Sequence, residues 1–326
     1  MALTQIRPPH NDGNGVAAED SAGFHRLLSV DQFHGSSYHE AVLKLRDGPY
    51  LEFPSCVSIE TLSLCNAACN FCPYPKLTRR GQSMTDRLIE KIFRDIEAIP
   101  NRPAFEFNLS TVNEPFLDPR VLDISDEIER RFPEATHAFF SNGSLLTETT
   151  LLRLGALKRV YYLILSVNDH RPSEYERTMR LPFARTIARL DLMHEMKKAG
   201  LLGFGIDLCR VGDQTAADAE FLEWVKAKYP LFNGIVTVRH DWMGATPPPP
   251  GYVPDVPCRQ WFQVHVLPDG SSPFCCIDSD ARNGFGNAET HHVIHELYNH
   301  PLKKKLRSQI PSRLSLDQCR QCTMLP

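Results

Sequence analysis

From Cys56 onward, short apolar runs alternate with longer amphipathic segments, and this alternation constrains the fold more than any other feature of the chain. Strands and helices that alternate along a sequence form a parallel sheet with helices packed against it. The predicted strands are Val57–Thr61, Phe105–Leu109, His137–Phe140, Tyr161–Ser166, Phe204–Arg210 and Ile235–Val238. The predicted helices, whose apolar residues recur at helical spacing, are Asp86–Ala98, Arg120–Arg131, Glu148–Gly155, Phe183–Ala199 and Ala216–Lys228. The predicted fold class is α/β, with Thr85 and Thr147 as N-caps of two helices.

The flanking segments differ from this alternating part in composition. Residues 1–20 are rich in Asn, Gly, Pro and Asp without periodicity, which is typical of a mobile tail. The run Pro247–Pro250 can neither continue a helix nor pair in a central strand, so we interpret it as a linker. Beyond it, Val264–Leu267 and Pro273–Cys276, joined by the turn Pro268–Gly270, predict a β-hairpin. The predicted parts are 1–54 as an N-terminal tail and cap, 55–246 as the α/β domain, 247–257 as the proline-rich linker and 258–326 as a small cysteine-rich domain.

Charge and apolar content argue against two classes of partner. The 326 residues include 36 Lys and Arg and 39 Asp and Glu, for a formal net charge of -3, and the longest block of like charge is Lys303–Lys305. That balance offers no basic surface for nucleic acid. No apolar run approaches the roughly 18 residues of a membrane-spanning helix, and the first residues lack a secretory signal, so we expect a cytoplasmic protein without a membrane partner. In that reducing compartment, ten cysteines favour metal ligation over disulfides.

Three of these cysteines, Cys65, Cys69 and Cys72, lie in one short loop directly after the first predicted strand. Their C-x₃-C-x₂-C spacing lets three thiolates curl around one iron–sulfur cluster and leaves one iron open. An open iron can take the amino and carboxylate groups of an amino acid. The alternative is a zinc site, but structural zinc usually takes four ligands in paired C-x₂-C knuckles, and no fourth partner lies nearby.

At this motif the chain resembles the radical SAM superfamily, whose signature C-x₃-C-x-Φ-C has an aromatic residue at Φ, here Phe71. The resemblance implies a partial (β/α)₆ barrel of the TIM type, with the cluster at the carboxyl ends of the strands. It also implies two cofactors, a [4Fe–4S] cluster on the three cysteines and S-adenosylmethionine (SAM) on its open iron. The six predicted strands agree with such a barrel.

Further turns match the family in the expected order after the strands. Ser110–Pro115 resembles the Gly-Gly-Glu-Pro segment that holds the methionine amino group, with Glu114 and the proline retained. Ser141–Gly143 resembles the family's Thr-Asn-Gly turn, and Ser166–Asn168 its Ser-Leu-Asp turn, with Asn168 in place of the acid. An ordinary acid at a helix start is the alternative for Glu114. The SAM-binding residues that the resemblance implies are Phe71, Tyr74, Asn113, Glu114, Ser141, Asn142, Ser166 and Asn168.

A second group of cysteines follows the proline run: Cys258, Cys275, Cys276, Cys319 and Cys322. Four thiolates complete an iron–sulfur site, and they equally suit the zinc of a zinc ribbon. Neighbouring strand residues point to opposite faces, so the sequence leaves open which of Cys275 and Cys276 is the ligand, although the Gly270-x₄-Cys275 spacing favours the first. The segment resembles the C-terminal SPASM extension in its shortened twitch form, which implies one auxiliary [4Fe–4S] cluster.

Candidate catalytic residues come from the last two predicted strands. Alternation along Phe204–Arg210 places Asp207 and Cys209 on the cavity face, where Asp207 can bond a hydroxyl and Cys209 is either a small core residue or a hydrogen-atom donor. Arg239 and His240, followed by Asp241, come after the sixth strand, at the same end of the barrel, or form a solvated loop there. A related twitch enzyme that oxidises an aminocyclitol uses an arginine in a similar stretch. Weaker candidates are Glu176 and Arg185.

The resemblance implies an enzyme that reductively cleaves SAM to a 5′-deoxyadenosyl radical, with a flavodoxin- or ferredoxin-type protein as electron donor. One auxiliary cluster is the architecture of sugar- and aminocyclitol-modifying enzymes of antibiotic biosynthesis. We therefore expect a small polyhydroxylated substrate, a sugar, aminocyclitol or nucleoside, that undergoes oxidation, dehydration, decarboxylation or epimerisation. Peptide modification or protein maturation is the alternative enzyme class. An iron–sulfur electron carrier or a zinc-ribbon scaffold is the non-enzymatic alternative.

Overall fold

The computed structural model describes residues 35–247 and 253–324. The tail expected at 1–20 and most of the proline run, Pro248–Pro250, lie outside the described residues. None of the helices in the described ranges is long and apolar enough to cross a membrane.

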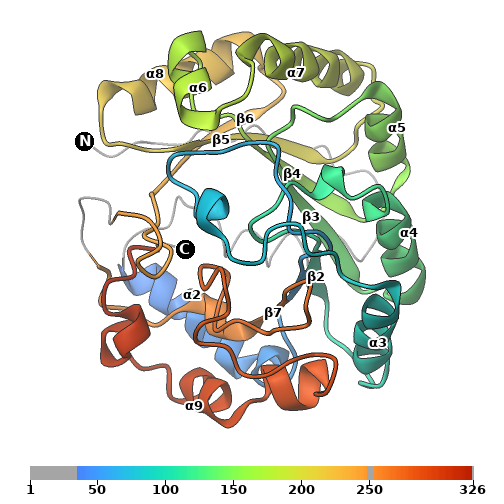
Figure 1. Ribbon diagram of the computed structural model, residues 1–326, viewed down its shortest axis with the longest axis vertical. Helices are drawn as coiled ribbons and strands as arrows, with labels where there is room; N and C mark the ends of the chain where they lie inside the picture. Colours follow the sequence, from blue (N-terminus) through green and yellow to red (C-terminus); the bar gives the residue numbers. More distant parts are fainter. Residues whose placement is uncertain (1–34, 248–252, 325–326) are drawn as a thin grey trace.

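Parallel strands form one sheet in the order β6-β5-β4-β3-β2-β1-β7. The sheet curves into an open barrel with β6 and β7 at its two edges (Figure 1). All six predicted strands are present, with ends shifted by one or two residues. The bounds are β1 (Cys56–Ile59), β2 (Phe105–Asn108), β3 (Ala135–Ser141), β4 (Val160–Ser166), β5 (Gly205–Val211), β6 (Asn233–Thr237) and β7 (Gln263–Val266).

Helices cover the outer face of the sheet (Figure 1). Each buries one apolar stripe against it, as α3 does with Leu88, Ile92 and Ile96. The two predicted N-caps are confirmed, because the Thr85 side chain accepts from Leu88 N and the Thr147 side chain accepts from Thr150 N. The helices are α3 (Asp86–Glu97), α4 (Val121–Arg131), α5 (Glu148–Ala156), α6 (Pro172–Met179), α7 (Phe183–Lys198) and α8 (Ala216–Lys228), of which only α6 was not predicted.

The predicted hairpin beyond the proline run is wrong. Strand β7 pairs in parallel with β1, from Cys56 opposite Gln263 to Ile59 opposite Val266, and Pro273–Cys276 forms no strand. The turn itself is present: Gly270 has a φ of +83°, and its N–H donates to Leu267 O at 2.9 Å. The apolar run that suggested a local hairpin therefore extends the main sheet instead, since pairing with β1 buries both of its faces.

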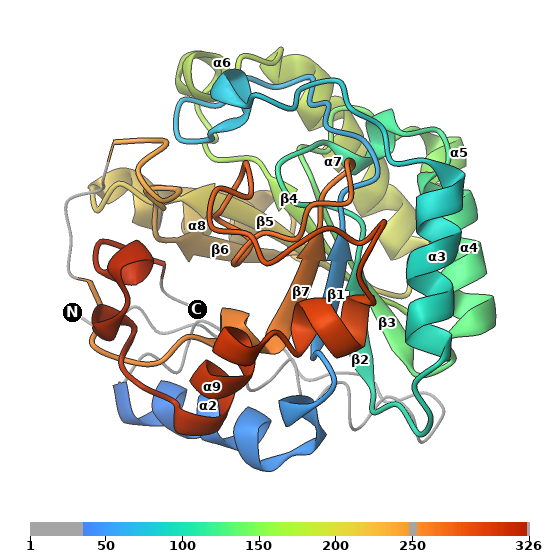
Figure 2. The ribbon, with the colours of Figure 1, turned by 60° about the horizontal axis from the view of Figure 1, so that its bottom comes forward.

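A second apolar core joins the two ends of the described chain. Tyr38, Val42 and Leu45 of α2 (Gly35–Asp47) pack with Trp261, Phe262 and Leu306, the last of which belongs to α9 (Pro301–Gln309). Figure 2 shows α2 and α9 next to each other below the sheet. The N-terminal cap is thus part of the support of the cysteine-rich segment.

Candidate active site

The loop that follows β1 brings Cys65, Cys69 and Cys72 together, each half-buried. Burial raises the pKa of Cys65 to about 11 and that of Cys72 to about 12. Burial also raises the pKa of Cys69, and the negative charges of Cys72 and Cys65 raise it further. Three soft donors that repel one another as thiolates suit a shared cationic iron–sulfur cluster, so the residues fit that group. Among the described residues, no three His, Cys, Asp or Glu side chains are close enough to hold a single metal ion, so these thiols suit a larger group that contains several irons.

The C-terminal end of α6 is hydrogen-bonded to this cysteine loop. Ala68 N donates to Met179 O, and Asn70 N donates to Thr178 O, both at 3.1 Å. The Met179 sulfur lies 3.5 Å from Cys69 Sγ. Carbonyls at a helix C-terminus have no partner within the helix, so they are free to accept these two bonds. The missed helix is therefore part of the site.

A buried ion pair between Glu60 and Arg79 fixes both ends of the loop. Glu60 follows β1, and its carboxylate accepts from Ser63 Oγ at 2.5 Å and from Val112 N at 2.9 Å. Arg79 Nη2 donates to Glu60 Oε2 at 3.0 Å, and Arg79 Nε donates to Ser279 O at 2.7 Å. Sequence reasoning missed this pair, whose only signal was a charge at the end of an apolar strand.

Glu114 lies where the predicted SAM segment meets the end of β3. Its carboxylate accepts from Ser141 Oγ at 2.8 Å and from Asn142 N at 2.7 Å. It also caps the short helical turn after it, through Phe116 N at 3.3 Å, so the helix-start alternative describes part of its role. Burial raises the pKa of Glu114 to about 7, and its charge raises the pKa of Cys65. A buried carboxylate in this state favours a cationic partner such as the SAM amino group.

The turn after β3 is bonded to the cysteine loop. Asn142 Nδ2 donates to Asn66 Oδ1 at 2.8 Å, and Asn66 Nδ2 donates to Ser144 Oγ at 2.9 Å. Arg185 of α7 reaches the same turn, through Nε to Ser144 O at 3.1 Å. Asn113 accepts from Thr111 N at 3.0 Å and so shapes the segment before Glu114. Of the predicted residues, Asn142 thus contacts the cysteine loop directly, and Arg185 contacts the turn that is bonded to it.

Ser166 ends β4, and Asn168 lies in the turn that follows. Asn168 has a φ of +66°, and its side chain accepts from Val211 N and donates to Met179 Sδ, both at 2.9 Å. Arg210, buried behind it, donates to Asn168 O at 2.5 Å and to Asp169 Oδ2 at 2.9 Å. Both polar ends of the Asn168 amide thus bind protein, which makes the turn rigid. Arg210 was not predicted, because its burial depends on ion pairs with Asp169, Asp213 and Asp218 that the fold creates.

Phe71 lies within the cysteine loop, and Tyr74 begins the short helical turn after it. Trp242 Nε1 donates to Phe71 O at 3.1 Å. Tyr74 is buried with Leu77, and Cys72 and Trp242 pack against them. The loop after β6 thus contacts the first group of cysteines.

The β5 candidates Asp207 and Cys209 face away from the helices, since Ile206 and Leu208, which alternate with them along the strand, pack in the main core. Asp207 accepts from Asn233 Nδ2 at 2.8 Å. Cys209 Sγ lies 3.7 Å from Thr237 Oγ1, and burial raises its pKa to about 11. The remaining weak candidate, Glu176, accepts from Phe183 N at 3.0 Å, at the start of α7.

The loop after β6 also reaches the second group of cysteines. Arg239 O accepts from Thr323 Oγ1 at 3.1 Å, next to Cys322. Burial lowers the pKa of His240 to about 4, so the imidazole is neutral. Burial raises the pKa of Cys319 to about 12, and the negative charge of Asp241 adds to that shift. One loop, Arg239–Trp242, therefore lies between the two groups of cysteines.

The second group consists of Cys258 and four further cysteines that lie around it. Burial raises the pKa of each of the other four, and the negative charge of Cys258 adds in every case. Cys275 and Cys276 both lie near Cys258 and Cys322, so geometry leaves open which one is a ligand. Arg313 donates to Val256 O at 3.2 Å, Pro257 O at 3.1 Å and Met324 O at 2.5 Å, which ties the two ends of this site together.

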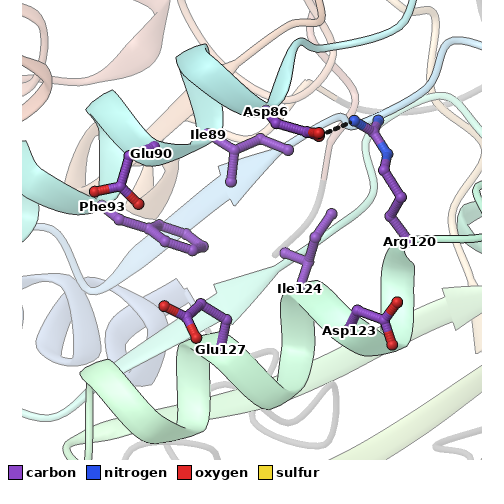
Figure 3. A pocket seen from close by; sticks show the side chains of 8 residues that line it. All are labelled: Asp86, Ile89, Glu90, Phe93, Arg120, Asp123, Ile124 and Glu127. Atoms are coloured by element: carbon purple, nitrogen blue, oxygen red, sulfur yellow. Dashed lines mark hydrogen bonds and ion pairs between the residues drawn. The ribbon is translucent and has the colours of Figure 1, made fainter.

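A separate groove lies on the helical surface between α3 and α4 (Figure 3). Its floor is Ile89, Phe93 and Ile124, and the acids on its rim are ion-paired with arginines, as Asp86 is with Arg120 at 2.5 Å. None of the predicted site residues lines it. The groove is thus apart from the predicted site residues.

The sequence matches the model of the radical SAM superfamily over residues 59–225. It matches SPASM, an iron–sulfur cluster-binding domain, over residues 258–323, a range that includes all five cysteines of the second group. This second match replaces the zinc-ribbon alternative. A comparison with curated proteins finds no match.

Many solved structures are similar in fold, and three of them serve as examples. BtrN in complex with AdoMet and 2-DOIA has a TM-score of 0.58 and 17% identity, over 84% of this chain and 94% of BtrN. Streptococcus suis SuiB bound to precursor peptide SuiA has a TM-score of 0.63 and 14% identity, over 94% of this chain and 81% of SuiB. Native anSMEcpe with bound AdoMet has a TM-score of 0.59 and 14% identity, over 82% of this chain and 86% of anSMEcpe.

Proposed function

This chain belongs to the radical SAM superfamily, and from that premise we propose that it removes a hydrogen atom from a carbinol carbon of a small polyhydroxylated substrate in natural-product biosynthesis. The superfamily domain binds SAM and a [4Fe–4S] cluster, and the SPASM domain binds auxiliary iron–sulfur. When bound, cluster and SAM supply a 5′-deoxyadenosyl radical, the species that accepts the hydrogen atom. The protein is therefore an enzyme, and the electron-carrier and scaffold alternatives no longer apply.

The observation that supports this substrate class is a set of buried polar atoms without protein partners. In the described part of the chain, Arg239 Nε, His240 Nδ1 and Asp241 Oδ1 are buried and have no hydrogen-bond partner. They lie on the loop between the two groups of cysteines. Buried polar groups are nearly always paired in a functioning protein, so these atoms suit a ligand rich in hydroxyl groups. A site that pairs with one hydroxyl rejects analogues that lack it.

Each residue has a distinct role in this proposal. Glu114 binds the amino group of SAM, and the Arg239 guanidinium donates to substrate hydroxyls. Neutral His240 accepts or donates one hydrogen bond without adding charge. Cys209 stays a protonated thiol at neutral pH, as a hydrogen-atom donor must be if the outcome is epimerisation. A flavodoxin- or ferredoxin-type protein supplies the electron.

Peptide modification is the second candidate. Its support is the similarity to SuiB bound to its precursor peptide, which extends over 94% of this chain. Against it, the second group has five cysteines, which suffice for only one four-cysteine cluster.

The test supplies reduced, loaded enzyme with SAM and a panel of sugars, aminocyclitols and nucleosides, alongside peptides. Substrate deuterated at the carbinol carbon is expected to deliver deuterium into 5′-deoxyadenosine. Arg239→Ala is expected to lower substrate turnover by about 10–100-fold, the loss of a charged hydrogen bond, and to leave uncoupled SAM cleavage unchanged. Arg94→Ala, on the exposed face of α3, is the control. If only a peptide is turned over, the substrate proposal fails.

A further inference from the structure

Arg79 is a buried side chain that touches both halves of the enzyme. Its guanidinium binds the Glu60 carboxylate and Ser63 Oγ, at the start of the SAM-cluster loop. On its other side, Nε donates to the backbone oxygen of Ser279, three positions after Cys276, at 2.7 Å. The blue loop after β1 and the orange segment before α9 meet here (Figure 1). One planar guanidinium thus bonds to both cluster-binding regions at once.

The Arg79 contact extends to the predicted SAM segment through Glu60. Glu60 Oε2, which accepts from Arg79, also accepts from Val112 N at 2.9 Å, two residues before Glu114. A shift of Arg79 therefore displaces both the entry to the cysteine loop and the segment before Glu114. A buried carboxylate depends strongly on its cationic partner, so the two cannot move independently.

Trp242 makes a second, independent contact between the same regions. Its indole N–H donates to Phe71 O at 3.1 Å, and its ring packs against apolar residues of both the cysteine loop and the auxiliary domain. Trp242 and Met243 have φ values of +52° and +51°, a conformation that is costly for residues other than glycine. Strain of this kind persists where the surroundings over-determine a position, which indicates that the contact is held in place.

We propose that Arg79 is a positioning residue for SAM binding, through which the folded auxiliary domain holds the SAM-cluster loop in its binding geometry. The auxiliary cluster then has a structural effect on the other site, because its cysteines order the segment that contains Ser279. This inference rests on the superfamily assignment and is independent of the substrate class. Failure of the polyol proposal leaves it untouched.

The first test is Arg79→Lys, which keeps a cation beside Glu60 but replaces the planar guanidinium fork, in which Nη2 binds Glu60 while Nε binds Ser279, with a single ammonium. We expect full iron content, SAM affinity weakened about tenfold by calorimetry, and faster amide hydrogen exchange over residues 60–79. The matched control is Arg102→Lys, since Arg102 also binds a carboxylate, that of Glu134, and a backbone oxygen, that of Ile99. Arg102 and Glu134 lie at the amino ends of β2 and β3, away from the cysteine loop that follows β1. Unchanged affinity and exchange in Arg79→Lys with full iron would overturn the proposal.

The second test removes the auxiliary cluster with the double substitution Cys319→Ala and Cys322→Ala. We expect this double variant to bind SAM more weakly when Arg79 is retained, and to show no further weakening when Arg79→Lys is added. Two changes that act through the same contacts are not additive. Fold-changes that multiply instead would show that the sites act independently. Should Arg79→Lys fail to fold, Trp242→Phe replaces the indole with a smaller aromatic ring and removes the N–H that donates to Phe71 O. An affinity equal to that of the unmodified enzyme would then count against the coupling.

Discussion

The two cysteine sites differ in the charges buried around them. Carboxylates surround the first, where the negative charges of Glu60 and Glu114 add to the burial that raises the pKa of Cys65. Cations surround the second. Arg313 opposes the rise in the pKa of Cys319 and Cys322, and Lys303 lies fully buried close to Cys275 and Cys276. Asp241 is the acid beside Cys319 and Cys322.

This difference indicates how each site balances the negative charge of a thiolate-bound cluster. The second site uses Lys303 and Arg313, which are permanent parts of the protein. At the first site, within the described part of the chain, Arg79 balances Glu60, and Glu114 is the buried carboxylate without a cationic partner. That arrangement suits a cationic ligand that binds and dissociates, as SAM does with its sulfonium and amino groups. We infer that the auxiliary site is built for a resident group and the first for an exchangeable one.

The largest expected effect separates the two sites by their irons. Cys65→Ala should lower the iron content from about eight to about four per chain and abolish SAM cleavage, because each cluster contributes four irons. Cys319→Ala should also remove about half of the iron but retain SAM cleavage by the reduced enzyme at saturating SAM. Iron analysis and 5′-deoxyadenosine release measure the two outcomes. Loss of cleavage in Cys319→Ala at saturating SAM would contradict a division of labour between the sites.

A smaller effect is expected from the carboxylates of the first site. Glu114→Ala should weaken SAM binding by about 10–100-fold without loss of iron, because one charge-assisted hydrogen bond contributes roughly 1.5–3 kcal/mol. Glu114→Gln removes the charge and keeps the length of the side chain, but it has one accepting oxygen where Glu114 uses two, for Ser141 Oγ and for Asn142 N. It therefore tests the charge with a smaller loss of contacts than Glu114→Ala. Calorimetric titration of loaded enzyme measures both variants. An affinity that does not change in either variant would remove Glu114 from the SAM site.

The smallest expected effect tests the cations of the second site. Lys303→Met should make the auxiliary cluster harder to reduce, because a positive charge nearby stabilises the more negative reduced state, and the shift should be roughly 60 mV, a tenfold change for one electron. Burial lowers the pKa of Lys303 to about 7, so the titration belongs below that pH, where the ammonium is charged. Lys304→Met, half-exposed and next in sequence, is the control. Equal potentials in both variants would contradict a role for the buried charge.

The sequence predicted those strands and helices that have an apolar pattern of their own. Six strands and five helices were found because each has its own apolar run or stripe, and Thr85 and Thr147 mark two helix starts by side-chain chemistry alone. Helix α6 was missed because it is short, largely polar and covered only through Tyr175 and Met179. The hairpin error had the opposite cause: β7 has a local pattern, but its partner is at the other end of the chain.

The cysteines and their neighbours were predicted because a spacing motif fixes them, and the polar supports were not. Glu60, Arg79 and Arg210 are ordinary charged residues in sequence, and their roles arise from burial that only the fold creates. Trp242 was missed for a similar reason, since its left-handed backbone and its bond to Phe71 depend on two loops far apart in sequence.

The pairing of β1 with β7 has a consequence for how the protein is made. About 200 residues of chain separate the two strands, and a ribosome working at roughly 5–20 residues per second needs about 10–40 s to synthesise them. During that interval the edge of β1 is open, directly before the cysteine loop. An unpaired edge invites intermolecular pairing. Synthesis that stalls before Gln263 should therefore yield aggregating chains, and timely completion of the auxiliary domain protects the nascent barrel.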